Sequence, residues 1–230
     1  TRWHAARPSS QRFRRNSEEA YADIVCATDA ALRSKLYRPE FISALQGHRP
    51  QDRYLRAMRE APAADPLSRA QYADLKIRLP GDMLTRMDRT SMAVGLELRE
   101  PLLDHRLVQF AAHLPSSLRI RGRSGKWLLK KALQRHLPRE VLQRRDVNPV
   151  APVGQWFSGV LAPAADAMAR DSALAELGWF DESAISRIIA DHRSQKVDRG
   201  SLLWRLLMLD MSLQKLFGLR RSSSYRASAK

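Results

Sequence analysis

The sequence has only one cysteine, Cys26, so no disulfide can form within the chain. An unpaired thiol is typical of proteins in a reducing compartment, and we therefore predict a cytoplasmic location. Nor does any stretch approach 18 consecutive apolar residues, so the sequence predicts no membrane-spanning helix and no membrane partner. A hydrophobic content of 44% is instead typical of a chain with a packed core.

Acidic residues are scarce. The sequence has 24 Asp and Glu and 40 Lys and Arg, which gives a formal net charge of +16. Such an excess favours an anionic partner. The excess is mostly Arg and is spread over the whole chain, which favours solvated side chains over one binding stripe. The sequence offers no helix patterned to read a nucleic-acid groove, so we do not expect nucleic acid as the partner.

Convincing strands are also lacking, since no segment alternates apolar and polar residues with a period of two. Helical spacing recurs instead, for example over 182–192 and 201–217, and the fold class is predicted as mainly α. We divide the chain into a basic segment over 1–16, a helical domain portion over 17–220 and a disordered tail over 221–230.

The segment 79–107, "LPGDMLTRMDRTSMAVGLELREPLLDHRL", crowds charges among apolar residues. One interpretation is structural: Glu97 forms a buried ion pair with Arg99 or Arg89, and Glu97, Arg99 and Asp104 together join a helix to the next segment. The other is functional: Asp82 and Arg86, four apart on one helix face, line a site for an anionic substrate. Pro80-Gly81 is expected to end one helix, and Asp82 to cap the next.

The apolar residues at helical spacing in this region and near the C-terminus are predicted to be largely buried. They are Leu84, Met87, Met92, Leu96, Leu103, Val108, Phe110, Leu128, Leu129, Leu203 and Leu206. No metal site is predicted, because His105, His113 and His136 lack the cysteine or carboxylate spacing of known sites. The stretch "RIRGRSGKWLLKK" does not match a phosphate-binding P-loop, so we interpret it as a cationic turn before a helix.

Several motifs, in order, give the sequence a family resemblance. They are "LPGDMLTRMDRTSMAVGLELREPLLDHRLVQFAAHLP", "GKWLLKKAL", "LPREVLQRR", "PVGQWF" and "LLWRLLML". Over about 72–218 the chain resembles the C-terminal half of the synthetase domain of glutamine-dependent asparagine synthetases and related bacterial amidotransferases. The resemblance implies the helical C-terminal part of an α/β ATP-pyrophosphatase domain, of the adenine-nucleotide α-hydrolase-like class.

The resemblance also implies an activity and site residues. The family activates a carboxylate, typically that of aspartate, as an acyl-AMP using ATP and Mg²⁺, and ammonia from glutamine then displaces AMP. By their places in the motif, Asp82 and Arg86 are the candidates for the acceptor and nucleotide site. Glu97, Arg99 and Asp104 match the family's "ExRxPxLD" pattern, which implies an architectural role.

Three departures accompany the resemblance. The family's SGGxDS pyrophosphate loop and its SGxGADE magnesium segment are absent, and so is the N-terminal cysteine glutaminase domain. In the family's R-P-K-x-G-F motif, Asp146 stands where the lysine is usual, although Arg144 or Arg145 could replace its charge. We therefore expect this chain alone to bind ATP and Mg²⁺ weakly and to be inactive.

Three hypotheses follow. The first is a C-terminal portion of an asparagine-synthetase-like amidotransferase, a fragment or the product of a truncated gene, which works with a missing N-terminal half on a small-molecule substrate. The second is a non-catalytic remnant that acts as an interaction module, for instance on an intact paralogue. The third is a basic helical protein that binds a polyanion, with steep salt dependence.

Overall fold

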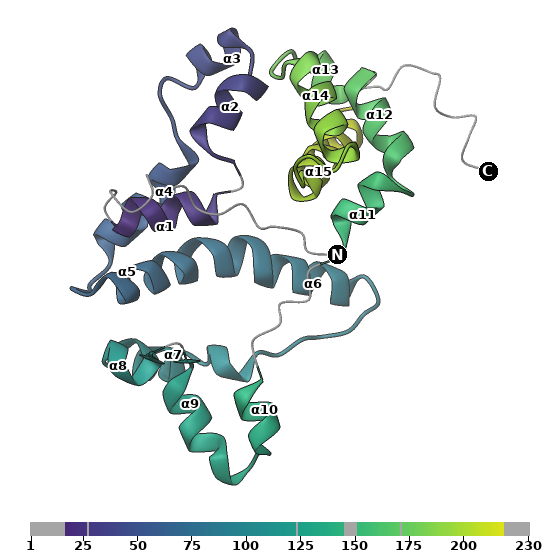
Figure 1. Ribbon diagram of the computed structural model, residues 1–230. Helices are drawn as coiled ribbons and strands as arrows, with labels where there is room; N and C mark the ends of the chain where they lie inside the picture. Colours follow the sequence, from purple (N-terminus) through teal and green to yellow (C-terminus); the bar gives the residue numbers. More distant parts are fainter. Residues whose placement is uncertain (1–16, 27, 123, 145–150, 171, 219–230) are drawn as a thin grey trace. The chain divides into compact units, whose positions relative to one another are not determined.

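The computed structural model describes residues 17–26, 28–122, 124–144, 151–170 and 172–218. Within them the chain is mainly α-helical, as predicted, and contains one sheet of two short strands. The chain divides into two compact units (Figure 1). Unit 1 holds the described residues of 23–50 and 149–218, and unit 2 holds those of 17–22 and 51–148. The proposed segment 1–16 and tail 221–230 lie outside the described residues.

Unit 1 is built from seven helices of the described chain. They are α2 (Ala30–Leu36), α3 (Pro39–Ala44), α11 (Val153–Ser158), α12 (Ala162–Arg170), α13 (Ala173–Glu176), α14 (Glu182–Arg193) and α15 (Gly200–Phe217). The bounds of α14 and α15 agree with the helical spacing read from the sequence. Asp181 caps α14 by accepting a hydrogen bond from the Ala184 amide.

The core of unit 1 forms between α15 and the helices that surround it. Leu203 and Leu206 on α15 are buried, as predicted, and pack with Phe157 of α11, Met168 of α12 and Ile185 of α14. The starts of α11 and α15 approach each other most closely at two glycines. A Cβ added to Gly200 would lie 2.6 Å from the backbone of Gly154, so glycine is required there.

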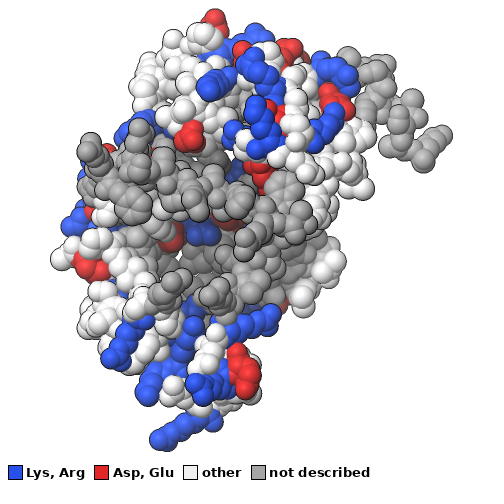
Figure 2. Space-filling model, viewed as in Figure 1, with Lys and Arg blue, Asp and Glu red and all other residues white. Residues whose placement is uncertain are grey.

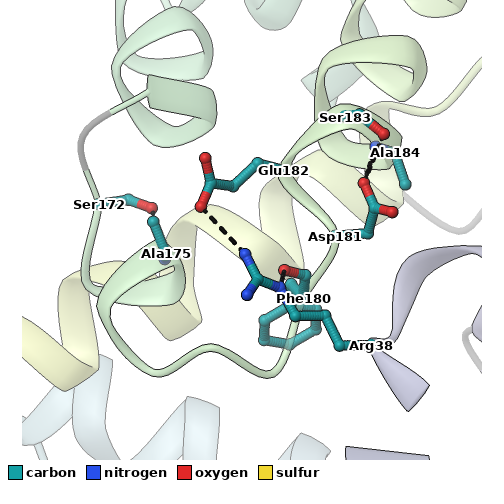
Figure 3. A network of polar contacts seen from close by, with 8 residues as sticks. All are labelled: Arg38, Ser172, Ala175, Phe180, Asp181, Glu182, Ser183 and Ala184. Atoms are coloured by element: carbon teal, nitrogen blue, oxygen red, sulfur yellow. Dashed lines mark hydrogen bonds and ion pairs between the residues drawn. The ribbon is translucent and has the colours of Figure 1, made fainter. Parts of the chain in front are cut away.

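A polar network ties α3 of unit 1 to the start of α14 (Figure 3). The Arg38 Nε donates a hydrogen bond to the Phe180 carbonyl at 3.0 Å, and its guanidinium reaches the Glu182 carboxylate at 3.3 Å. Tyr37 forms an isolated β-bridge with Phe180 next to this network. Backbone and side-chain contacts together therefore join segments that are far apart in the sequence.

Unit 2 begins with the first part of α1 (Ser17–Val25), which ends in unit 1. Its other elements are α4 (Pro50–Glu60), α5 (Pro66–Ala73), η2 (Asp74–Leu84), α6 (Thr85–Met92), η3 (Pro101–Leu103), α7 (His105–His113), α8 (Ser116–Arg119), β1 (Ile120–Arg121), β2 (Ser124–Gly125), α9 (Trp127–Ala132), η4 (Leu133–Arg135) and α10 (Arg139–Gln143). The two strands pair antiparallel, with Ile120 opposite Gly125.

The longest feature of unit 2 runs continuously from α5 through η2 to α6 (Figure 1). The prediction that Pro80-Gly81 ends a helix, with Asp82 capping the next, is therefore wrong. The segment η2 is a π-helix with Pro80 inside it. In an α-helix the proline ring would collide with the carbonyl four residues earlier, and the wider π-helical turn changes that register. Gly95, at φ +71°, follows the end of α6 as expected.

The core of unit 2 is small. It consists of Leu55, Ala57 and Met58 on α4, together with Ala22 and Ala73. Polar contacts supplement it. The Tyr21 hydroxyl donates to Asp74 Oδ2 at 2.6 Å, and both burial and this hydrogen bond raise the pKa of Tyr21.

Candidate functional site

Asp82 and Arg86 lie one turn apart, across the junction of η2 and α6. The Asp82 Oδ1 is 3.8 Å from an Arg86 guanidinium nitrogen, which is the ion pair that their i, i+4 spacing predicts. Both side chains are more than half exposed. An exposed carboxylate next to a guanidinium can bind an ammonium group and a carboxylate or phosphate of the same small molecule.

The backbone around this pair is unusual because η2 is π-helical over 11 residues. The Thr85 hydroxyl donates to the Pro80 carbonyl at 2.6 Å and satisfies an oxygen near the end of that segment. Single π-turns inside α-helices occur frequently at functional sites. Asp82 lies inside this π-helix, two residues before its end at Leu84.

The predicted ion pair between Glu97 and Arg99 forms, but it is not buried. The two charged groups are 2.7 Å apart, and their side chains are 69% and 83% exposed. The expectation of a buried pair is wrong because the loop after α6 is exposed throughout, including its apolar residues Leu96 and Leu98. Solvent screens such a pair, so it contributes little to stability.

Asp104 has a local role at the start of α7. Its carboxylate accepts from the Arg106 backbone amide at 3.0 Å and is 3.1 Å from the Arg106 Nε. The side-chain hydrogen bond from Arg106 is the main reason why the pKa of Asp104 is lowered. Asp104 therefore caps α7 and pairs with Arg106. Among the described residues, its ion-pair partner is neither Glu97 nor Arg99, which pair with each other.

Asp146 and the loop around it lie outside the described residues, together with Arg145. Their proposed roles stay predictions. Arg144 is described, and it lines an open pocket with four other cationic residues of unit 2. The sequence stretch "RIRGRSGKWLLKK" contributes to that pocket, but local sequence alone indicated only a cationic turn.

Most of the predicted core of unit 2 is exposed, which corrects the sequence prediction. Met87, Met92, Leu96, Phe110 and Leu129 are each between 38% and 58% exposed. Leu84, Leu103, Val108 and Leu128 are only partly buried. These residues do recur at helical spacing, but within the described chain no other element covers the helix faces that carry them.

Leu103, Val108, Leu128 and Leu129 line a groove of about 750 Å³ within unit 2, whereas Met87, Met92, Leu96 and Phe110 are not among its lining residues. Leu79 and Met83 of η2 line it together with Leu103, Leu107 and Val108 from the segment that follows α6. Asp82 directly precedes Met83 in the sequence. The groove and the candidate polar pair thus share the same helical segment.

Arg119 is a structural residue that sequence reasoning missed. Its guanidinium donates to Gln71 Oε1 and Ser68 Oγ and lies 3.6 Å from Asp65 Oδ2, with its side chain only 12% exposed. These contacts tie α8 to the start of α5. Its partners lie about 50 residues earlier, so no local signal in the sequence could have identified it.

The described residues hold no group of three or more His, Cys, Asp or Glu side chains that could bind a metal ion. Over the same residues, no helix is long and apolar enough to span a membrane.

Comparison with known proteins identifies a family. The asparagine synthase family model matches residues 2–214. A Mycobacterium tuberculosis protein assigned as a glutamine-hydrolysing asparagine synthetase is 33% identical over 150 residues, which cover 65% of this chain and 23% of that protein. Asparagine synthetase 1 of Bacillus subtilis is 26% identical over 149 residues, with the same coverage. The chicken asparagine synthetase is 41% identical over 80 residues, which are 32% of this chain and 14% of that protein.

The matched regions therefore span about a quarter or less of these relatives. No solved structure matches the chain.

Proposed function

Because the chain belongs to the asparagine synthase family, we propose that it supplies the helical, acceptor-binding part of an amide-forming synthetase site. The activity would be the ATP- and glutamine-dependent conversion of a carboxylate, typically aspartate, into an amide through an acyl-AMP. In this proposal Asp82 binds the ammonium group of the acceptor and Arg86 binds an anionic group of the acceptor or the nucleotide. Mg²⁺ and ATP would be held mainly by a complementary ATP-binding half.

The observation that carries the proposal is the uncovered apolar groove that η2, the element that holds Asp82, helps to line. Fully burying one large aliphatic or aromatic side chain contributes about 1.5–3 kcal/mol. Leu79, Met83 and Leu107 line the groove. Leu96 and Phe110, which lie within about a dozen residues of Leu107 in the sequence, are also exposed. A partner layer that covers this face would gain that energy, and it would place its own residues next to the polar pair.

The second candidate is a non-catalytic module that uses the same apolar face to dock on an intact paralogue. Asp146 favours it, because an anion stands where the family motif has a lysine. A negative charge facing phosphates would raise the barrier of the reaction instead of lowering it. The two candidates share a docking face and differ only in whether amide is formed.

A chimaera separates the two candidates. The region of the Mycobacterium tuberculosis relative that matches this chain would be replaced by the sequence of this chain, and AMP and amide formation would be measured. If the proposal is right, the chimaera forms amide, and Asp82→Asn or Arg86→Gln lowers the rate by about 100-fold or more, as loss of charged contacts to a bound substrate does. Glu97→Gln is the matched control, and we expect it to change the rate by less than about threefold.

The Asp146 prediction uses the same chimaera. We expect Asp146→Lys to raise the rate of AMP release by about tenfold or more, because it restores a cation at the family's lysine position. Full recovery is not expected, since Asn148 and Pro149 also depart from the motif. A fast chimaera that is insensitive to Asp146→Lys would show that another cation acts there. A chimaera with no amide formation in either variant supports the docking module.

A further inference from the structure

The second open pocket of unit 2 has a volume of about 1250 Å³ and is strongly cationic. The β1–β2 hairpin, α9 and the segment that includes α10 line it. Its five cationic side chains come from three separate elements: Arg121, Lys130, Lys131, Arg139 and Arg144. Figure 2 shows Lys and Arg side chains gathered over the end of the molecule where Figure 1 draws α9 and α10.

Among the described residues that line this pocket, none is acidic. In the contacts of the described chain, none of the five cations has an ion-pair partner. Elsewhere in the same chain arginines are paired, for example Arg69 with Glu18 and Arg193 with Asp166. The acid on α10, Glu140, is exposed and does not line the pocket. The five cationic side chains therefore repel one another, and a bound anion would offset that repulsion.

We propose that this pocket binds a linear chain of phosphate groups, such as inorganic polyphosphate. The pocket presents five cations around a space much larger than one phosphate, so a single phosphate would leave part of that space and charge unused. A phosphate chain carries regularly spaced charges that can pair with several cations at once. Lys130 is partly buried, whereas the other four cations are exposed. One end of the phosphate chain would therefore bind at Lys130, and the rest would extend toward the exposed cations.

The lining favours a phosphate chain over a nucleic acid. Single-stranded nucleic acids are held by aromatic rings on which their bases stack, in addition to basic side chains. Among the described lining residues, Trp127 is the one that is aromatic. Its ring is already covered by the Arg121 guanidinium, which lies 5.1 Å from the ring centroid. The described lining therefore offers five cations but only one aromatic ring, and that ring already has a cationic partner.

The test is calorimetry of the whole chain with short-chain inorganic polyphosphate in buffer without Mg²⁺. We expect it to bind at least about 100-fold more tightly than orthophosphate, and affinity should fall steeply with salt. The double variant Lys130→Gln/Arg139→Gln should weaken binding by about 10-fold to 100-fold. It should also lower the slope of log affinity against log salt by about two, one for each lost contact.

A matched double variant controls for net charge. Arg89→Gln/Arg135→Gln also removes two positive charges from unit 2, but at residues that do not line the pocket. We expect it to weaken binding by less than about threefold and to leave the salt slope unchanged. If it weakens binding as much as the pocket variant, only the overall charge attracts the anion and the proposal is wrong.

Two other outcomes would also overturn the proposal. One is orthophosphate binding as tightly as polyphosphate. The other is single-stranded RNA of equal charge binding more tightly and responding to the same pocket variant, which would make the site a nucleic-acid site. Circular dichroism checks that the variants are folded. If the double variant is unfolded, Lys131→Gln at an exposed position replaces it, with an expected loss of about threefold to tenfold. The proposal is independent of amide formation, so either can fail alone.

Discussion

Arg99 and Arg119 show how differently two arginines of unit 2 are used. Arg99 pairs with Glu97 in solvent, whereas Arg119 is nearly buried and joins α8 to α5. We expect Arg99→Ala to lower the free energy of unfolding by less than about 0.5 kcal/mol, because exposed ion pairs are weak. Arg119→Ala should cost about 1–3 kcal/mol, because the nearly buried guanidinium and its hydrogen bonds to Ser68 and Gln71 are lost together.

Urea unfolding of both variants, followed by circular dichroism, measures this difference. Each variant removes one arginine, so they match in net charge. Equal midpoints for the two variants would contradict the contrast in burial on which the prediction rests.

Gly200 is required at the start of α15 because the backbone of α11 leaves no room for a side chain. A Cβ at this position would lie 2.6 Å from Gly154 Cα and N. Gly200→Ala should therefore destabilise the protein by about 1–3 kcal/mol, as overpacking of a tight contact does. Gly81→Ala is the control, since a Cβ there meets nothing within 4 Å. We expect the thermal unfolding midpoint of Gly81→Ala to equal that of the wild type or to exceed it. An equal loss of stability in Gly81→Ala and Gly200→Ala would contradict the prediction.

At the scale of one element, the start of α14 links stability to pH. Asp181 accepts hydrogen bonds from the Ser183 hydroxyl and the Ala184 amide, and these lower the pKa of Asp181. A lowered folded-state pKa means that ionised Asp181 stabilises the fold above its unfolded pKa of about 3.9. That contribution is lost as the pH falls through the folded-state pKa.

Asp181→Asn isolates this effect, because asparagine also caps helices but does not titrate. We expect the wild type to lose stability relative to Asp181→Asn as the pH falls below about 4. Asp181→Ala should cost about 1 kcal/mol at neutral pH. Urea midpoints of the three proteins across the acid range test both statements, and parallel pH profiles for wild type and Asp181→Asn would contradict the assigned cap.

At the scale of the whole molecule, the two units have unequal cores. Unit 1 buries large side chains from α11 to α15, among them Phe157, Ile185 and Leu203, whereas the buried cluster of unit 2 holds five of its described residues. Apolar burial is the main stabilising contribution to folding. Backbone amides of α14 and α15 should therefore exchange with solvent more slowly than those of α7 to α10.

Hydrogen exchange followed by mass spectrometry measures this gradient in the isolated chain. Covering the apolar groove with a partner should slow exchange in α7 and η2 and leave α15 unchanged. Uniform protection across both units would contradict the unequal cores.

Local patterns were sufficient for α14 and α15 of unit 1 and for the Asp82–Arg86 pair. The caps and apolar spacing of α14 and α15 lie within a few residues of one another, and an i, i+4 pair needs only one helix turn. The same applies to the family, whose motifs are contiguous stretches of sequence. In these cases the interacting groups are neighbours along the chain, so their geometry follows from the helix itself.

Burial depends on contacts that local spacing does not contain. Periodicity places Leu96 and Phe110 on apolar faces, but only the packed chain shows that both are exposed, because burial needs a second element to cover the face. The π-helix through Pro80 and the close approach of Gly154 to Gly200 depend on the path of the whole backbone. The five cations that line the cationic pocket lie on β1, on α9 and in the segment 139–144, and tertiary packing alone brings them together.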